Sequence, residues 1–165
     1  MKFQRQVSRR LNDEHIALLE LLTHFEQALM KLKTDPPEDG DAVWSKLLST
    51  LGTALSYEVS RHFDFEEVQL FPRLHDASQG DLAEMLFEEH ETIREVVTPL
   101  VGLLSKARAW ELDRAGWQAL KVSGLELCER LSAHAEKEQG ALVPLIDELL
   151  DEATDRELLE EYGMA

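Results

Sequence analysis

The sequence is poor in cysteine, and this excludes a fold held together by disulfides. Cys128 is the one cysteine among 165 residues, so no disulfide can form within the chain. Small secreted domains usually depend on several disulfides, whereas reducing compartments keep thiols free. Residues 1–5 also lack the apolar stretch of a signal peptide. We therefore expect a cytoplasmic protein in which Cys128 is a small buried hydrophobic residue rather than a reactive thiol.

Basic residues are also scarce, and this disfavours two classes of partner. The chain has 17 lysines and arginines against 33 aspartates and glutamates, a formal net charge of -16. Nucleic acids and anionic lipid surfaces are bound mainly through lysine and arginine. The apolar runs are only a few residues long, too short to cross a bilayer. We expect neither nucleic acid nor membrane as a partner.

Proline and glycine are few and clustered, so the helical pattern is interrupted at few places. Between these breaks, apolar residues recur every three or four positions, which is the period of a helix. With 44% hydrophobic residues, the chain can bury a core of its own as one domain spanning residues 1–165. The pattern predicts an all-α fold, an up-down-up-down four-helix bundle with a short C-terminal helix. The four long helices are expected at about 8–33, 41 to 71 or 74, 81–109 and 113–150.

Particular residues are expected to begin these helices. Asp41, Asp81 and Asp113 stand where an aspartate can cap the second, third and fourth helices. Thr154 and Glu157 have the spacing of a capping box for the short final helix.

Polar residues occupy the stripes that should face the interior of the bundle. At 100° per residue, His62 and Glu66 continue the stripe of Leu48, Leu51, Leu55 and Val59, while His134 and Glu138 lie with Leu120, Leu127, Leu131, Leu145 and Leu149. His15 lines up with Leu11, Leu19 and Leu22, and His90 with Leu86, Val97, Val101 and Leu104. Buried imidazoles and carboxylates are costly unless paired, hydrogen-bonded or bound to metal, so these six predict a common partner. His24 and His75 fall outside the pattern. They are expected to be solvated, or to contact the ligands without binding the metal themselves.

The four histidines are expected at one level of the bundle. Side chains that meet across a helical hairpin lie at similar distances from its turn, because each helix rises 1.5 Å per residue. The midpoint between His15 and His62 falls in the turn at residues 35–40, and that between His62 and His90 falls at residue 76. The midpoint between His90 and His134 falls beside Asp113. The three turns therefore predict one shared site.

The two halves of the chain also resemble each other. His62 and Glu66 are followed by Pro72 at the same interval at which Pro144 follows His134 and Glu138. This repetition indicates an internal duplication and hence two metal positions. We predict that His15 and His62 bind one ion, His90 and His134 the other, and that Glu66 and Glu138 bridge both. Imidazole and carboxylate ligands without thiolate suit iron or manganese, and zinc less so. The Glu-x-x-His element of ferritin-like bundles is absent.

These elements resemble the hemerythrin-like, or HHE cation-binding, family over nearly the whole chain. The resemblance rests on His15, the element His62-Phe63-x-x-Glu66-Glu67 with Pro72, Glu89-His90 and His134-x-x-x-Glu138. It implies two irons with bridging carboxylates and an oxo or hydroxo bridge, which bind dioxygen, peroxide or nitric oxide. Some members carry or sense oxygen, and others are linked to peroxide removal or iron control.

One position departs from the oxygen carriers of this family. Their third helix has a second histidine four residues after the first, where this chain has Arg94. Arg94 either pairs with an acid or reaches solvent, or it stabilises an anionic oxidant at a coordination position opened by the missing imidazole. Glu67 is expected behind the ligands or at the surface, and Glu89 and Glu91 are reserve ligands.

Several functions are compatible with such a site. Binding of dioxygen or a related small oxidant, for storage, delivery or sensing, is the first hypothesis because the site is complete. The alternatives are a peroxide-removing enzyme of catalase or peroxidase type, and an iron-responsive interaction module that orders when metal binds. A bundle without metal would leave six polar groups destabilising its core.

Overall fold

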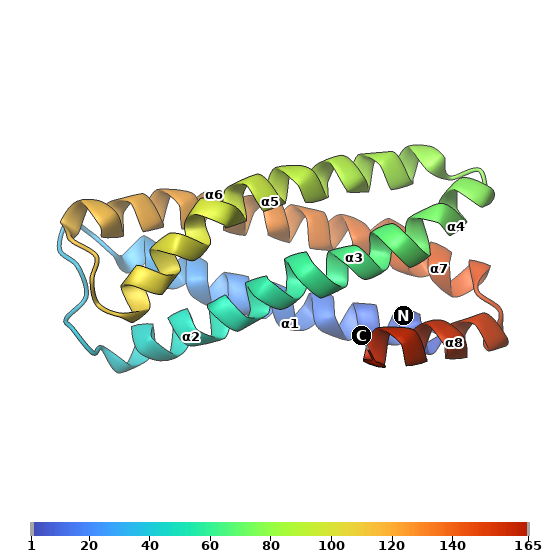
Figure 1. The fold of residues 1–165 in the computed structure, drawn as a ribbon, viewed down its shortest axis with the longest axis horizontal. Coiled ribbons are helices and arrows are strands. Elements are labelled where there is room, and N and C mark those ends of the chain that lie inside the picture. The colour runs from blue at the N-terminus through green and yellow to red at the C-terminus, as the bar shows by residue number, and fades with distance from the viewer. Residues whose placement is uncertain (1, 165) are drawn as a thin grey trace.

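A computed structural model describes residues 2–164, and its helices lie mostly along one long axis (Figure 1). The prediction of an all-helical fold is confirmed, since no strand occurs among the described residues. The first long rod is α1 (Gln6–Lys31) and the third is α5 (Gly80–Arg108). The second and fourth rods each contain short π-helical turns, labelled η. The second rod consists of α2 (Ala42–Tyr57), η1 (Glu58–His62), α3 (Phe63–Phe65), η2 (Glu66–Leu70) and α4 (Phe71–Asp76). The fourth consists of α6 (Arg114–Lys137), η3 (Glu138–Leu142) and α7 (Val143–Leu149), and α8 (Glu152–Met164) follows it.

Two of the predicted helix caps are confirmed and two are wrong. Asp41 accepts a hydrogen bond from Trp44 N and Asp113 accepts one from Gly116 N. Asp81, however, lies inside the first turn of α5, which begins at Gly80 because the connection closes within three residues through a bond from Gln79 N to Leu74 O. The capping box at Thr154 and Glu157 is also wrong. The carboxylate of Asp151, just before α8, accepts from Thr154 N and begins the helix three residues earlier.

The start of α1 is capped by residues from the other end of the chain. Arg5 precedes the helix and provides no side-chain cap. Asp147 of α7 accepts hydrogen bonds from the backbone N–H groups of Gln4 and Arg5, and Asp155 of α8 accepts from those of Gln6 and Val7. These carboxylates satisfy N–H groups that have no partner within the helix and lie at its positive end. The helix α8 accordingly packs against α1 (Figure 1).

The buried face of each long helix follows rows of residues seven apart. In α5, Leu86, Ile93, Leu100 and Ala107 form one row, and His90, Val97 and Leu104 form the other. A seven-residue repeat is the pattern of helices that wrap around one another with 3.5 residues per turn. The expectation that Val101 faces inward is therefore wrong: extrapolation at 3.6 residues per turn placed it on the stripe, and its side chain is 47% exposed.

The three π-helical turns each begin at a buried glutamate: Glu58, Glu66 and Glu138. Each turn is closed by a backbone bond across five residues, so it holds one residue more than an α-helical turn. This extra residue moves the buried face by one position. After η3, Ile146 and Leu150 are buried, and the predicted inward position of Leu149 is wrong, since it is 40% exposed.

Two apolar clusters occupy the core on either side of a polar layer. The larger includes Leu18 and Leu55, and the smaller includes Leu11 and Phe65. Along α1, His15 lies between Leu11 of one cluster and Leu18 of the other, and along α5, His90 lies between Leu86 and Ile93. No helix in the described residues is long and apolar enough to cross a membrane.

Candidate metal centre

Four buried histidines, one from each long rod, meet in this polar layer. His15, His62 and His90 are fully buried, and His134 is 2% exposed. The Nε2 atoms of His15 and His62 lie 3.2 Å apart, and those of His90 and His134 lie 3.1 Å apart. The structure thus brings the four histidines together as two pairs, with the division that the sequence predicts.

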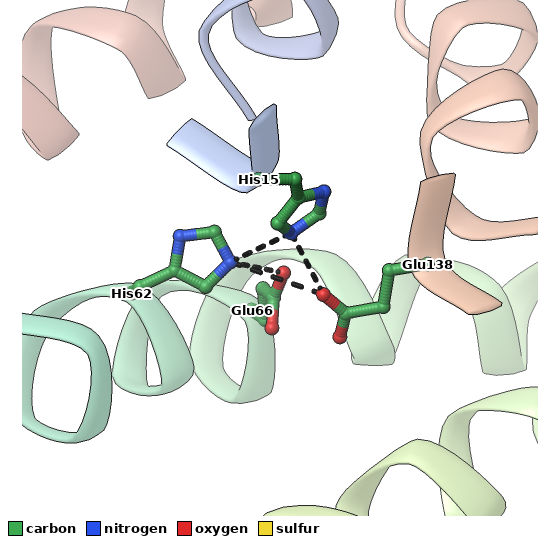
Figure 2. Close-up of side chains that lie close together, drawn as sticks. All are labelled: His15, His62, Glu66 and Glu138. Carbon is green, nitrogen blue, oxygen red and sulfur yellow. Dashed lines mark hydrogen bonds and ion pairs between the residues drawn. The ribbon is translucent and has the colours of Figure 1, made fainter. Parts of the chain in front are cut away.

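Each of two buried carboxylates faces both histidine pairs. Glu66 places Oε1 2.9 Å from His62 Nε2 and Oε2 3.2 Å from His90 Nε2. Glu138 places Oε2 2.9 Å from His15 Nε2 and Oε1 2.8 Å from His134 Nε2. Figure 2 shows the first half of this arrangement, in which Glu66 and Glu138 point between His15 and His62. Each half is a group of four buried side chains that could hold a metal ion, and the two groups share both glutamates.

The outer nitrogen of every one of these imidazoles faces a hydrogen-bond acceptor. His62 Nδ1 lies 2.9 Å from Glu14 Oε2, and His15 Nδ1 lies 3.1 Å from Gln139 Oε1. On the other side, His90 Nδ1 is 2.7 Å from Glu67 Oε1 and His134 Nδ1 is 2.8 Å from Glu89 Oε2. An acceptor at Nδ1 holds the proton of a neutral imidazole there, so the lone pair on Nε2 points inward.

The inward-facing atoms fit a cation better than they fit one another. The four carboxylate oxygens of Glu66 and Glu138 are buried and accept no hydrogen bond, although imidazole nitrogens lie close to them. Lone pairs on Nε2 and on carboxylate oxygens repel each other unless a positive charge lies between them. Two donors that bind one ion at about 2.1 Å and at right angles are about 3.0 Å apart, close to the observed separations of 2.8 to 3.2 Å between Nε2 and carboxylate oxygen.

The buried carboxylates also raise the pKa values of the histidines beside them. Burial alone would lower the pKa of His90, but the carboxylates of Glu138 and Glu66 outweigh it and raise the pKa to about 9. For His134, burial is likewise outweighed, chiefly by Glu138, and the pKa rises to about 10. The site therefore attracts positive charge, whether from protons or from metal ions.

Glu58 is a further buried carboxylate that the predicted ligand set omits. It is 5% exposed, and its Oε1 lies 3.9 Å from His62 Nε2. Burial raises its pKa, which the charge on His62 lowers in part. Its signal in the sequence is the row Trp44, Leu51 and Glu58, spaced by seven residues. A period of 3.6 residues per turn predicts Val59 at the buried position instead of Glu58.

Arg94 pairs with acidic side chains, closely with two of them and at 3.8 Å with Asp64. Its Nη2 lies 2.8 Å from Glu67 Oε1 and its Nη1 lies 2.8 Å from Glu91 Oε1. The same Glu67 oxygen accepts from His90 Nδ1, so Arg94 is connected to His90 through Glu67. Glu89 is likewise a hydrogen-bond partner of His134, and it also pairs with Lys137. His24 and His75 are exposed, and Cys128 is buried, as predicted.

A helix beyond the duplicated halves supports His62. Tyr162 of α8 is 2% exposed, stacks on Phe65 with ring centroids 4.2 Å apart and donates to Glu14. Tyr57 donates to the other oxygen of Glu14. Glu14 thus connects His62 to two tyrosine hydroxyls.

Comparison with known families agrees with this geometry. The sequence profile of the hemerythrin HHE cation-binding domain matches residues 6–146. The chain belongs to the hemerythrin HHE cation-binding family. No curated protein matches the sequence closely enough to be reported as a relative. The matched region of this hemerythrin domain contains all six predicted ligands and Glu58, and it ends before α8. Its clustered histidines and glutamates are the groups through which it can bind cations.

Proposed function

We propose that this hemerythrin domain holds two iron ions and uses them to bind dioxygen or a related small oxidant such as peroxide or nitric oxide. One observation carries the proposal. Each of the carboxylates of Glu66 and Glu138 places one oxygen beside the first histidine pair and the other oxygen beside the second pair. Imidazoles and carboxylates without thiolate are ligands that iron accepts. Manganese is the competing metal.

A pair of iron ions supplies the electrons that dioxygen or peroxide takes up. The residues of this chain position those ions and keep water away from them. Glu14, Glu67 and Glu89 hold protons on the outer nitrogens of three histidines, which makes the inner nitrogens better donors. Phe63 stacks on His90 with ring centroids 3.7 Å apart and covers it. The ligands are thus fixed in one orientation within a buried layer of the core.

A small ligand can approach from the side of His134. A surface pocket of about 240 Å³ is lined by His134 and Glu89 together with Thr92, Ile93, Glu129, Arg130 and Ala133. This pocket suits a diatomic molecule or peroxide better than a large organic substrate.

Metal analysis combined with spectroscopy tests the proposal. Protein made in iron-sufficient cells is expected to contain about two irons per chain, one for each of the two ligand groups. Its near-ultraviolet charge-transfer absorption should change when the reduced protein meets air. Fully folded protein that takes up neither iron nor manganese would overturn the metal site. If two irons bind but the spectrum does not respond to dioxygen, peroxide or nitric oxide, the proposal that the site binds a small oxidant would be overturned.

Peroxide removal is a second candidate, and the environment of Arg94 favours it. The third rod offers one imidazole, and one turn later Arg94 stands in contact with Glu67, which holds His90. A missing imidazole would leave a coordination position on the metal open to peroxide, which favours peroxide turnover over simple binding. Mixing iron-loaded protein with hydrogen peroxide and following oxygen release separates the two functions. Many turnovers per chain favour the enzyme, and a single stoichiometric change favours binding.

A further inference from the structure

Glu58 occupies a core position that an apolar residue would normally fill. It continues the buried row of Trp44 and Leu51 at the same seven-residue interval, and it begins η1, the turn that ends at His62. Only 5% of it is exposed, so its carboxylate has lost most of its hydration. A buried carboxylate without a positive partner is strongly unfavourable.

The surroundings of Glu58 offer it one partner. In the part of the chain that the structure describes, its single ion pair within 4 Å is with His62 Nε2, the inward-facing nitrogen. His62 already presents Nδ1 to Glu14, so its neutral form has no second proton for Glu58. The separation of 3.9 Å between Glu58 Oε1 and His62 Nε2 falls within the range of roughly 3.0 to 4.2 Å for two ligands of one ion.

The other half of the bundle has no such carboxylate. The last buried core residue before His134 is Leu131, which is 1% exposed, and the residue four before His134 is the exposed Arg130. The internal duplication is therefore broken at this point, since the core holds an acid beside one histidine pair and a leucine beside the other.

From this asymmetry we infer that Glu58 is an additional ligand of the ion held by His15 and His62. The inference rests on the proposed two-iron site and deepens it. In the structure, the first group consists of His15, His62, Glu66 and Glu138, and the second of His90, His134, Glu66 and Glu138. Glu58 lies just outside the first group, beside His62, and its carboxylate would turn toward the ion as a fifth ligand when the ion binds. The vacant coordination positions therefore belong mainly to the second ion. A surface pocket lined by His134 and Glu89 also lies beside the ligands of the second ion.

Two substitutions at Glu58 test the inference through metal binding rather than activity. Glu58→Gln keeps the shape and removes the charge, and Glu58→Leu gives the first half the residue type of Leu131. Ferrous iron is titrated anaerobically into the metal-free full-length chain against a competing chelator. Both variants are expected to bind the first ion about tenfold or more weakly and to change the second affinity little. In the Mössbauer spectrum of the wild type, two distinct iron environments should appear, and they should become more alike in Glu58→Leu.

The stability of the metal-free protein distinguishes a ligand role for Glu58 from a purely structural one. Glu58→Leu removes a desolvated carboxylate, so the metal-free variant should unfold at a higher urea concentration than the wild type even though it binds iron more weakly. If the wild type binds two irons and both variants bind them with unchanged affinity and unchanged Mössbauer spectra, the ligand assignment is overturned while the two-iron site stands. A wild type that binds no pair of irons overturns both.

Discussion

The hydroxyl of Tyr162 donates a 2.6 Å hydrogen bond to Glu14 Oε2, the same oxygen that faces His62 Nδ1 at 2.9 Å. Through this oxygen, a helix outside the family match acts on a candidate metal ligand. Burial would raise the pKa of Glu14, but hydrogen bonds from His62, Tyr162 and Tyr57 outweigh it and lower the pKa to about 2. Glu14 therefore stays ionised and keeps His62 oriented at any pH near neutrality.

Replacement of Tyr162 by phenylalanine should loosen this arrangement without removing the ring that stacks on Phe65. We expect a loss of about 1 kcal/mol in the free energy of unfolding, measured with urea, because one buried hydrogen bond to a charged acceptor disappears. The affinity for ferrous iron should also fall by a few-fold, since His62 is held less firmly. An unchanged iron affinity together with reduced stability would limit Tyr162 to a structural role.

Glu138 should be the most sensitive of the predicted ligands. Its two oxygens lie within 3.9 Å of all four inward-facing histidine nitrogens. Glu138→Gln removes the charge that both ions share, so we expect the iron content after dialysis to fall below one ion per chain and the affinity to drop by at least about tenfold. Glu136→Gln, at an exposed position of α6, is the matched control and should bind iron normally. Equal iron contents in the two variants would contradict the bridging role.

The stability of the metal-free protein should depend on pH in a definite direction. The pKa values of His90 and His134 rise to about 9 and about 10 in the folded chain, above the unfolded value of 6.5. A raised folded pKa adds stability that is fully present below 6.5 and is lost as the pH rises toward 10. The urea midpoint of the metal-free chain should therefore fall between pH 6 and pH 10. Iron replaces the protons, so iron affinity should rise over the same interval, and a midpoint that rises with pH would contradict the charge assignment.

Arg94 offers a test of the missing imidazole. In Arg94→His, the new side chain stands one turn after His90, where the oxygen carriers of the family have a second histidine. We expect stronger reversible dioxygen binding, followed by absorption spectroscopy, and less peroxide turnover, because the set of histidines would then match that of the family's oxygen carriers. Arg94→Gln is the control for loss of the contacts with Glu67 and Glu91. The hypothesis fails if Arg94→His leaves both the visible spectrum and peroxide turnover at the wild-type level.

The cap provided by Asp155 should matter for stability and not for metal chemistry. Asp155 is 4% exposed and accepts from the N–H groups of Gln6 and Val7. Asp155→Asn should destabilise the fold by about 1 to 3 kcal/mol in urea, because charge-assisted bonds at the positive end of α1 are weakened. The exposed Glu157→Gln on the same helix should change stability by less than about 0.5 kcal/mol. Equal stability of the two variants would show that the cap contributes nothing.

The sequence was sufficient to predict the rods and the level at which their histidines meet. Both depend on regular quantities, the helical period and the rise of 1.5 Å per residue, which hold over most of each helix. His15 and His134 are 119 residues apart, yet equal distances from three turns place them in one layer. The pairing of inner nitrogens at 3.1 and 3.2 Å is the structural counterpart of that calculation.

The sequence was insufficient wherever the helix departs from that regular period. The π-helical turn at Glu138 carries one extra residue, so Leu149 turned outward and Leu150 inward. The supercoil of α5 moved Val101 off the buried face by the same kind of drift. Glu58 was missed for this reason too, since its row is visible only at a seven-residue spacing. The cap of α1 by Asp155 depends on tertiary contact and leaves no local signal.

The capping of α1 by residues of α7 and α8 also affects the order in which the protein matures. During translation, α1 emerges before α7 and α8. The N–H groups at its start therefore have no cap until Asp147 and Asp155 are made, and His62 has no contact with the hydroxyl of Tyr162 until α8 is made. The helix that carries His15 is thus fully capped only after α8 has left the ribosome. We expect metal insertion to be a late, post-translational event, and chains truncated before α8 to be poor acceptors of iron although they retain every predicted ligand.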